Sequence, residues 1–263
     1  MTQAVSLGSA RQAFLAMLAR DIYVTSREIG AYLAQDLIQP FFFLFIFVRV
    51  LGSAGVVSND YGQTMLPGLL ALISFFGALQ AVAFRLVLEF EWTLEIEDRL
   101  LAPLSLPLVA MEKVVFGACR GVLSSLLMVP IGLIVLSGVS WPLSGLAPAL
   151  FSMALGGLIG GAVGLVFGTI VPPRRVTIVF SVLVAPLLFT GSVQFPWYSL
   201  TGERWFQVLC ALNPLTYISE GIRASLVPSI AHIPYWLCTI VSLAGIAGFG
   251  RLGIHGFLRR ALR

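Results

Sequence analysis

Charged residues are scarce in this chain, and only one of them is a lysine. Charged residues make up 11% of the 263 positions and hydrophobic residues 58%, with a mean hydropathy of +0.96. Soluble domains carry roughly 25% charged residues, so the composition predicts an integral membrane protein. The single lysine, Lys113, lies between Glu112 and Val114. A G-x-x-x-x-G-K-[ST] phosphate-binding loop needs its lysine between glycine and serine or threonine. The chain therefore has no such ATPase site, and ATP-driven work would need a separate subunit.

Residues that build metal and catalytic sites are also few. The three cysteines form no C-x-x-C pair and the two histidines are isolated, so packing is their expected role. A disulfide between Cys210 and Cys238 is an open alternative. The clustered acidic residues have no histidine beside them, and no nucleophile motif is present. We therefore predict no catalytic residue, no metal site and no cofactor in this chain.

Long apolar runs dominate what the sequence does contain. A bilayer-spanning helix needs about 20 mostly apolar residues, and six stretches meet this requirement. They cover residues 31–51, 64–84, 114–136, 146–171, 176–193 and 234–250. Before the first span, residues 11–29 mix apolar and charged side chains, which predicts an amphipathic helix at the membrane interface, with a soluble helix as the alternative. The predicted fold is an all-α membrane protein with one transmembrane domain, residues 1–263.

The basic residues predict the orientation of these spans. If the N-terminus is cytoplasmic, only Arg49, Arg204 and Arg223 of the sixteen basic residues fall on the outer side. Cytoplasmic loops carry an excess of lysine and arginine, so both termini are expected in the cytoplasm. Tryptophan favours the headgroup level of a bilayer, and four tryptophans fall near the predicted outer interface. They are Trp141, Trp197, Trp205 and Trp236.

Between the last two spans lies a segment of intermediate polarity, residues 195–229, which we call the outer segment. Asn213 and Pro214 form a helix start, with asparagine as the N-cap and proline at the first helical position. Glu220 and Arg223 are three residues apart and can pair. An apolar side formed by Leu215, Ile218 and Ile222 opposes a polar side with Thr216 and Ser219. This pattern predicts short amphipathic helices that lie at, or dip into, a membrane surface.

The connection between the second and third spans, residues 85–113, is longer than adjacent spans require. It holds an excess of acidic over basic residues, whereas cytoplasmic loops beside anionic lipids usually favour basic ones. This acidity indicates a protein partner, and a short helix could dock in a groove of a cytoplasmic subunit. A solvated loop is the alternative. The candidate docking residues are Glu91, Glu95, Glu97, Asp98, Leu100 and Leu101.

Two features of the first span are candidates for a substrate path. Asp36 lies within the apolar run, where an ionised carboxylate is costly and usually faces the bundle interior or water. It could contact substrate, bond another helix or lie at the inner interface. Phe43 and Phe47 belong to a dense aromatic run, for which contact with lipid or neighbouring helices is the alternative to lining a path.

The fourth span carries glycines at intervals of four. They make a smooth stripe on one helix face that permits close approach of another helix. Packing within the bundle is the expected role, and a surface for conformational sliding is the alternative. The four residues are Gly156, Gly160, Gly164 and Gly168.

Two motifs resemble one family of membrane proteins. Arg99–Ser105 (RLLAPLS), followed by Glu112 and Lys113, resembles the stretch after the second span of ABC-2 type transporter permeases. Ala185–Phe195 (APLLFTGSVQF), followed by Leu212–Arg223 (LNPLTYISEGIR), is similar to their fifth span and NPLTY…R signature. Drug-export permeases of the daunorubicin-resistance type and nodulation-factor export permeases are the most similar in pattern. The sequence departs from the family at Leu106, where a basic residue is usual.

The resemblance implies a permease subunit of an ABC exporter in the bacterial inner membrane. It would form a homodimer or pair with a paralogue, and would bind two cytoplasmic ATPase subunits that carry ATP and Mg. Residues 91–101 would contain the coupling helix. Residues 195–229 would form re-entrant half-helices that close the outer end of the path. The gate residues would be Asn213, Pro214, Tyr217, Glu220 and Arg223.

The family's cargo is diverse, because its members export drugs, lipids, lipo-oligosaccharides and polysaccharides. Apolar spans without rows of buried charge favour an amphipathic, lipid-linked or drug-like substrate moved by alternating access. An ATP-independent secondary transporter or channel is the main alternative, although such proteins tend to have ionisable relays or internal repeats. A non-transporting scaffold would explain the acidic connection but not the outer segment.

Overall fold

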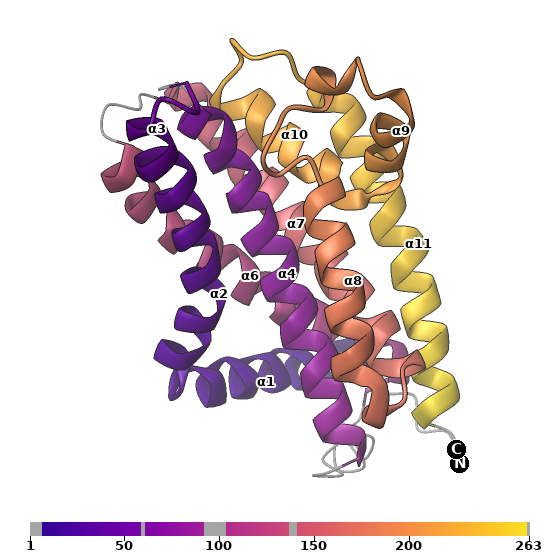
Figure 1. Ribbon diagram of the computed structural model, residues 1–263. Helices are drawn as coiled ribbons and strands as arrows, with labels where there is room; N and C mark the ends of the chain where they lie inside the picture. Colours follow the sequence, from indigo (N-terminus) through magenta and orange to yellow (C-terminus); the bar gives the residue numbers. More distant parts are fainter. Residues whose placement is uncertain (1–6, 59–60, 92–103, 137–140, 262–263) are drawn as a thin grey trace, which may run out of the picture.

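The computed structural model describes residues 7–58, 61–91, 104–136 and 141–261. Within these ranges the chain is a bundle of helices and has no strand. Six long helices run roughly side by side, α1 lies across one end of them, and α9 and α10 lie at the other end (Figure 1). The α-helices are α1 (Leu7–Ser26), α2 (Ile29–Leu44), α3 (Leu51–Ser53), α4 (Tyr61–Glu91), α6 (Leu106–Leu136), α7 (Leu143–Ile170), α8 (Val176–Thr190), α9 (Arg204–Leu212), α10 (Pro214–Leu226) and α11 (Tyr235–Ala261). The short elements are a π-helix, η1 (Phe45–Val50), and two 3-10 helices, η2 (Pro173–Arg175) and η3 (Trp197–Leu200).

Five helices are long and apolar enough to cross a membrane. They cover Ile29–Ser53, Tyr61–Glu89, Leu106–Leu136, Leu143–Ile170 and Tyr235–Arg260. The predicted fifth span, 176–193, corresponds to α8, which has 15 residues. At 1.5 Å per residue α8 is about 22 Å long, less than the ~30 Å of a hydrocarbon core. The protein is thus a multi-pass membrane protein, and the sixth crossing stays a prediction.

The centre of the bundle is formed by α4 and α7, which pack at backbone distance. A Cβ at Gly160 would overlap the Phe75 carbonyl of α4, and one at Gly164 would lie 2.6 Å from the Leu79 carbonyl. At the two ends of the stripe, Gly156 faces Ser74 and Gly168 faces Leu86, both also on α4. The glycine spacing therefore places one face of α7 directly on α4, as expected for small residues at a helix–helix interface.

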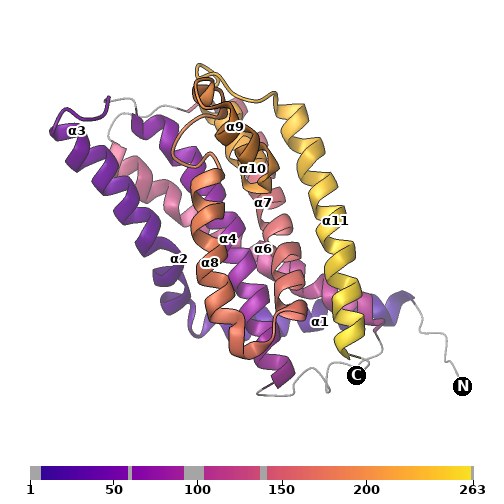
Figure 2. The same ribbon diagram turned by 45° about the vertical axis from the view of Figure 1, so that its right-hand side comes forward.

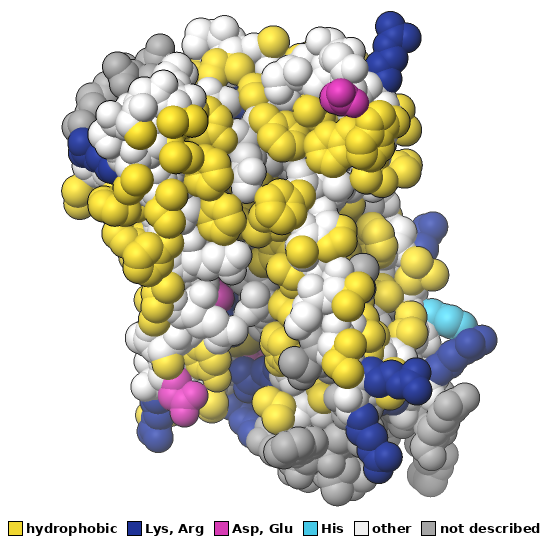
Figure 3. Space-filling model, in the orientation of Figure 1, with side chains coloured by type: hydrophobic (Ala, Val, Ile, Leu, Met, Phe, Trp, Pro, Cys, Tyr) yellow, Lys and Arg dark blue, Asp and Glu magenta, His cyan; other side chains and the backbone are white. Residues whose placement is uncertain are grey.

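Helix α1 lies across the others at the end where α11 finishes (Figures 1 and 2). It covers most of the predicted interfacial helix, residues 11–29. Leu15, Ile22 and Tyr23 are exposed on it, whereas Asp21 is fully buried. On the face shown in Figure 3, most Lys and Arg side chains gather at this same end, and hydrophobic side chains cover much of the middle and the opposite end. This distribution is typical of a protein whose cytoplasmic end is basic.

The predicted connection 85–113 is much shorter in the structure. Helix α4 continues to Glu91 and α6 begins at Leu106, so the connection is 92–105. Glu89 and Glu112, which the prediction counted as loop acids, are buried in these two helices and are not available to a partner. Glu91 ends α4. The other candidate docking residues, Glu95, Glu97, Asp98, Leu100 and Leu101, lie outside the described residues.

Candidate functional site

The outer segment holds two helices with different surroundings. On α9 the apolar side chains of Trp205, Val208 and Leu212 are exposed, which suits a helix that lies on a membrane surface. On α10 both faces are buried. The polar side of this helix is therefore covered by other segments of the chain, and its place relative to the membrane stays a prediction. Periodicity distinguishes two faces of a helix but not what covers each of them.

The start of α10 is capped as predicted. The Asn213 side-chain oxygen accepts a hydrogen bond from the Leu215 amide at 2.9 Å, and Pro214 occupies the first helical turn. The Asn213 side-chain amide donates to the Leu187 carbonyl and to the Thr190 hydroxyl, both at 2.8 Å. One residue thus begins α10 and joins it to the last turn of α8.

The rest of the polar face of α10 continues this contact. The last four carbonyls of a helix have no partner within the helix, and in an apolar bundle each would be costly to leave unpaired. Four side chains of α10 or its cap, spaced three or four residues apart, bond to carbonyls in the last turn of α8 or in the two residues that follow it. Asn213 donates to Leu187, Ser219 to Gly191 at 2.9 Å and Arg223 to Ser192 at 2.9 Å. The Thr216 hydroxyl lies between two carbonyls, at 2.6 Å from that of Cys210 in α9 and at 3.0 Å from that of Thr190.

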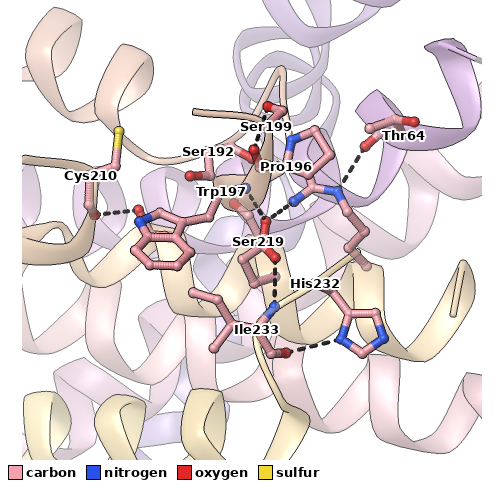
Figure 4. Close-up of polar contacts among 12 residues, drawn as sticks. Thr64, Ser192, Pro196, Trp197, Ser199, Cys210, Ser219, His232 and Ile233 are labelled. Carbon is pink, nitrogen blue, oxygen red and sulfur yellow. Dashed lines mark hydrogen bonds and ion pairs between the residues drawn. The ribbon is translucent and has the colours of Figure 1, made fainter. Parts of the chain in front are cut away.

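An ion pair between Glu220 and Arg223 joins the segments that carry Thr64, Ser192 and Ile233, which Figure 4 labels. Both side chains are 0% exposed. The Arg223 guanidinium also donates through Nε to the Thr64 carbonyl of α4 at 3.2 Å and through Nη2 to the Ser192 carbonyl. This arginine therefore connects α10 to the outer end of α4 and to the end of α8.

The Glu220 carboxylate connects two further segments. Its Oε1 accepts from the Trp197 amide of η3, and its Oε2 accepts from the Ile233 amide just before α11, both at 3.0 Å. We call Glu220, Arg223 and the backbone groups that they bind the outer clamp. Tyr217, the remaining predicted gate residue, donates its hydroxyl to the Ala211 carbonyl at 2.8 Å and ties α10 to α9. The outer clamp thus joins α10 to α4, to the residues after α8, to η3 and to the segment before α11.

A second set of buried charges lies at the other end of α4, and the sequence analysis missed it. Lys113 of α6 bonds Asp21 of α1 at 3.1 Å and Glu89 of α4 at 2.6 Å. Arg85 of α4 bonds the same two carboxylates at 3.0 and 3.2 Å. We call these four residues the inner ion cluster. Its two cations and two carboxylates balance, and together they fasten α1 to α4 and α6. The signal in the sequence was the i,i+4 spacing of Arg85 and Glu89, together with Lys113, the single lysine of the chain.

Asp36 bonds a neighbouring helix, one of the three alternatives that the sequence left open. Its carboxylate accepts from the Ser124 hydroxyl at 2.8 Å and from Arg120 at 3.3 Å, both on α6. The Arg120 guanidinium also lies 4.4 Å from the centre of the Tyr32 ring. Asp36 therefore joins α2 to α6 inside the bundle.

The two phenylalanines of the predicted path pack along the outer half of the first span. The rings of Phe43 and Phe47 stack at 5.9 Å, and Phe47 lies 6.2 Å from the ring of Tyr61. Both are partly buried against the main hydrophobic core. Contact with a substrate stays a prediction for both residues.

The cysteines and the acidic groups add no further site in the part of the chain that is described. Cys119, Cys210 and Cys238 are free thiols, so the disulfide that was left open is not formed. Among the same residues no group of three or more His, Cys, Asp or Glu side chains is placed to hold a metal ion.

Comparison with known proteins identifies the family. The chain matches the family model described as ABC-2 type transporter over residues 12–227. The chain belongs to the ABC-2 type transporter family. The permease is also similar to two proteins named "Putative transport permease ycf38". It is 26% identical to the protein of Porphyra purpurea over 203 residues, which cover 73% of this chain and 67% of the relative. It is 26% identical to the protein of Cyanophora paradoxa over 220 residues, which cover 80% and 72%.

The charged side chains of both networks of the permease lie within the part that matches the family. All four residues of the inner ion cluster and both charged residues of the outer clamp, Glu220 and Arg223, lie within residues 12–227, whereas the Ile233 amide of the clamp lies just beyond them. The family assignment makes this chain a membrane-spanning transport subunit, in agreement with the predicted resemblance. The geometry adds two points at which its helices are fastened together, one at each end of α4.

Proposed function

We propose that the permease is the membrane subunit of an ATP-driven exporter and works as a dimer. Separate ATPase subunits, which bind ATP and Mg, would supply the energy, since the chain lacks a phosphate-binding loop. Membership of the ABC-2 type family supports this proposal. The concentration of basic side chains at the α1 end supports an orientation with both termini in the cytoplasm of a bacterial cell. The cargo would be an amphipathic, lipid-linked or drug-like molecule.

The observation that carries the proposal is the course of α4. This helix has 31 residues, which corresponds to about 46 Å. Its inner end is held in the inner ion cluster and leads directly into residues 92–105. Near its outer end, the Thr64 carbonyl accepts from Arg223 of the outer clamp. A displacement that begins at the proposed ATPase contact would therefore be transmitted along one rigid helix to the outer segment.

The proposed transport cycle follows from these two attachment points. ATP binding would close the ATPase pair and move the 91–101 region, and α1, α4 and α6 would move together because the inner ion cluster joins them. At the outer end the same movement would displace Thr64 from Arg223 and open the outer clamp. Alternating access is then a shift between two populations of the bundle. The π-helical turn Phe45–Val50 offers α2 a place to bend.

The proposed sixth crossing combines α8 with the outer segment. Helix α8 ends inside the bundle, and the polar face of α10 supplies donors to its last carbonyls. The chain can therefore turn back at membrane depth without exposing unpaired carbonyls to lipid. In this arrangement α10 acts as a re-entrant half-helix that closes the outer end of the path.

The test is co-purification in mild detergent followed by an ATPase assay on the recovered complex. An ATP-binding subunit is expected in the complex, together with ATP-dependent transport in proteoliposomes. Reversal of Glu95, Glu97 and Asp98 to lysine should weaken the association at least about tenfold without preventing membrane insertion. Glu203→Lys, an exposed change in the outer segment, is the matched control and should leave association unchanged. Transport without ATP and without a bound ATPase would reject the proposal.

A further inference from the structure

A polar cleft lies where α1 turns into α2. It has a volume of about 570 Å³ and is bounded by the end of α1, the start of α2, the inner half of α4 and part of α6. Figure 1 shows the helices α1, α2 and α4, which contribute to its walls. Its lining includes Tyr32, Gln35, Gln80 and Arg120. We call it the elbow cleft, and neither the inner ion cluster nor the outer clamp accounts for its open volume.

The charges around the elbow cleft cancel. Three of its carboxylates already bind cations of the same chain, since Asp21 and Glu89 bind Arg85 and Asp36 binds Arg120. An ionic headgroup would meet no net attraction, and to pair with Arg85, Glu89 or Arg120 it would have to displace a partner that each of them already binds. Arg27, Glu28, Arg85, Glu89 and Arg120 line the cleft, whereas Asp21, Asp36 and Lys113 do not line it but pair with Arg85, Arg120 and Glu89, and these four acidic and four basic residues together carry no net charge.

Apart from Arg27 and Glu28, which are neighbours of opposite charge, and the Nε of Arg120, which has no hydrogen-bond partner among the described residues, the groups available to a ligand are uncharged. The Gln35 side-chain amide donates to the Gln80 side-chain oxygen at 2.8 Å. An amide side chain can donate two hydrogen bonds and accept two, so this pair keeps an acceptor on Gln35 and donors on Gln80. Tyr32 presents a hydroxyl on the same wall. Such a mixture of donors and acceptors suits a ligand that also carries both, such as hydroxyl or amide groups.

An apolar groove adjoins the elbow cleft on the other side of the Arg120–Tyr32 contact. It has a volume of about 150 Å³, and its walls include Ile22, Leu33 and Leu123. Tyr32 and Arg120 line both spaces and separate them. The two spaces together therefore present a polar chamber beside an apolar one, which matches a molecule with a headgroup and a hydrocarbon chain.

The Gln35–Gln80 bond also borders a smaller space further along the bundle. This space, of about 50 Å³, lies between α2, α4 and α8 and is lined by Asp36 and Gln39 as well as the two glutamines. It leads from the elbow cleft toward α8, whose end the outer segment covers. Opening of one neutral hydrogen bond would join the two spaces.

We propose that the elbow cleft binds the uncharged, hydrogen-bonding headgroup of an amphipathic substrate, while the substrate's apolar chain occupies the adjoining groove. Gln35 and Gln80 bind the headgroup and exchange their mutual bond for bonds to it as the substrate moves toward α8. Tyr32 adds its hydroxyl at the boundary of the two spaces. This inference rests on the proposed transport function and specifies the substrate's headgroup chemistry and its first binding site.

The test is lipid binding to the purified permease, measured by native mass spectrometry in detergent. Three synthetic lipids with the same acyl chains serve as probes: monoglucosyl diacylglycerol, which is uncharged, zwitterionic phosphatidylcholine and anionic phosphatidylglycerol. The uncharged lipid is expected to bind at least about fivefold more tightly than the other two, as one or two additional hydrogen bonds would give. Gln80→Leu should remove this preference, and Tyr32→Phe, which keeps the ring beside Arg120, should reduce it.

The controls separate this inference from the proposed function and from misfolding. Gln12→Leu makes the same change at an exposed position of α1 and should leave the preference intact. Elution as a single species in size-exclusion chromatography establishes that each variant is folded. Tightest binding of phosphatidylglycerol, equal binding of the three lipids, or an unchanged preference in folded Gln80→Leu would overturn the inference. The measurement needs no ATPase, so a negative result leaves the co-purification test unaffected, and loss of ATPase association leaves lipid binding interpretable.

Discussion

The coupling energy between Glu220 and Arg223 provides the sharpest test of the outer clamp. Both side chains are 0% exposed, so removal of one leaves the other as a buried charge. Such a change typically costs about 3–5 kcal/mol of stability. In Glu220→Gln the arginine loses its counter-charge and has only uncharged acceptors, the carbonyls of Thr64 and Ser192 and the amide oxygen of the new glutamine. In Arg223→Met the carboxylate keeps two backbone amides, so we expect a cost of about 3 kcal/mol, at the lower end of this range.

The double variant determines how much of these costs belongs to the pair. With both charges removed, no unpaired charge is buried, and the loss of stability should fall short of the sum of the two single losses by about 3 kcal/mol. This is a ratio of about 150-fold in the unfolding equilibrium. Reversible unfolding in SDS mixed micelles measures all four proteins of the cycle. Glu203→Gln, an exposed carboxylate bonded to Trp205, is the control and should change stability by less than about 0.5 kcal/mol.

A coupling energy below about 1 kcal/mol would refute the reasoning, because that is the value of a solvent-exposed ion pair. It would mean that water reaches the outer clamp and that the pair does not fasten the outer segment. If the coupling is large, ATP-dependent export is the second measurement. Each single variant that still inserts and still binds the ATPase should then lose export to a greater extent than assembly.

Three further predictions concern other elements. A Cβ at Gly160 would overlap the backbone of α4, so Gly160→Ala should destabilise the permease by about 1–3 kcal/mol. A Cβ at Gly248 would meet nothing within 4 Å, so Gly248→Ala is the control. Equal effects of the two changes in SDS unfolding would contradict the close packing of α7 on α4. Asp21→Asn leaves Lys113 with one carboxylate partner and should speed amide hydrogen exchange in α1 while membrane insertion persists; unchanged exchange would contradict the fastening role. Burial raises the pKa of the Cys210 thiol to about 11, so near neutral pH it should resist N-ethylmaleimide. In a variant that lacks Cys119 and Cys238, Cys210 should react at least about tenfold faster when Glu220→Gln is also present. An equal rate would show that the outer segment stays closed.

Local chemistry explains the features that the sequence could predict. An asparagine followed by proline starts a helix because each residue acts within its own turn, and the structure shows this cap at Asn213. The pairing of Glu220 with Arg223 is equally local, since residues three apart are neighbours on a helix surface. The apolar runs and the family motifs were sufficient for the membrane class and for the family. Each of these features depends on residues close together in the chain.

The features that could not be predicted depend on contacts between distant segments. The polar face of α10 is buried because the carbonyls that it binds belong to the end of α8, and nothing in the α10 pattern identifies them. Asp21 and Lys113 are 92 positions apart and meet only because α1 crosses the bundle. The predicted acidic connection, 85–113, is longer than the connection in the structure, 92–105, for a related reason. Charges near a helix end are usually solvated, but here Glu89 is neutralised inside the bundle by cations from two helices.

The short length of α8 and the polarity of α10 are two consequences of one requirement. A helix that ends inside an apolar bundle leaves carbonyls that must be paired, and the polar side chains of α10 are spaced so that they pair them. Because these bonds are buried or part-buried, partial opening would leave unpaired groups at high cost. The outer segment is therefore expected to be either fully closed or displaced as a unit, with few intermediate positions. Arg223 binds the Ser192 carbonyl just after α8 and the Thr64 carbonyl of α4. A movement of α4 is therefore sufficient to shift the outer segment between its closed and its displaced position.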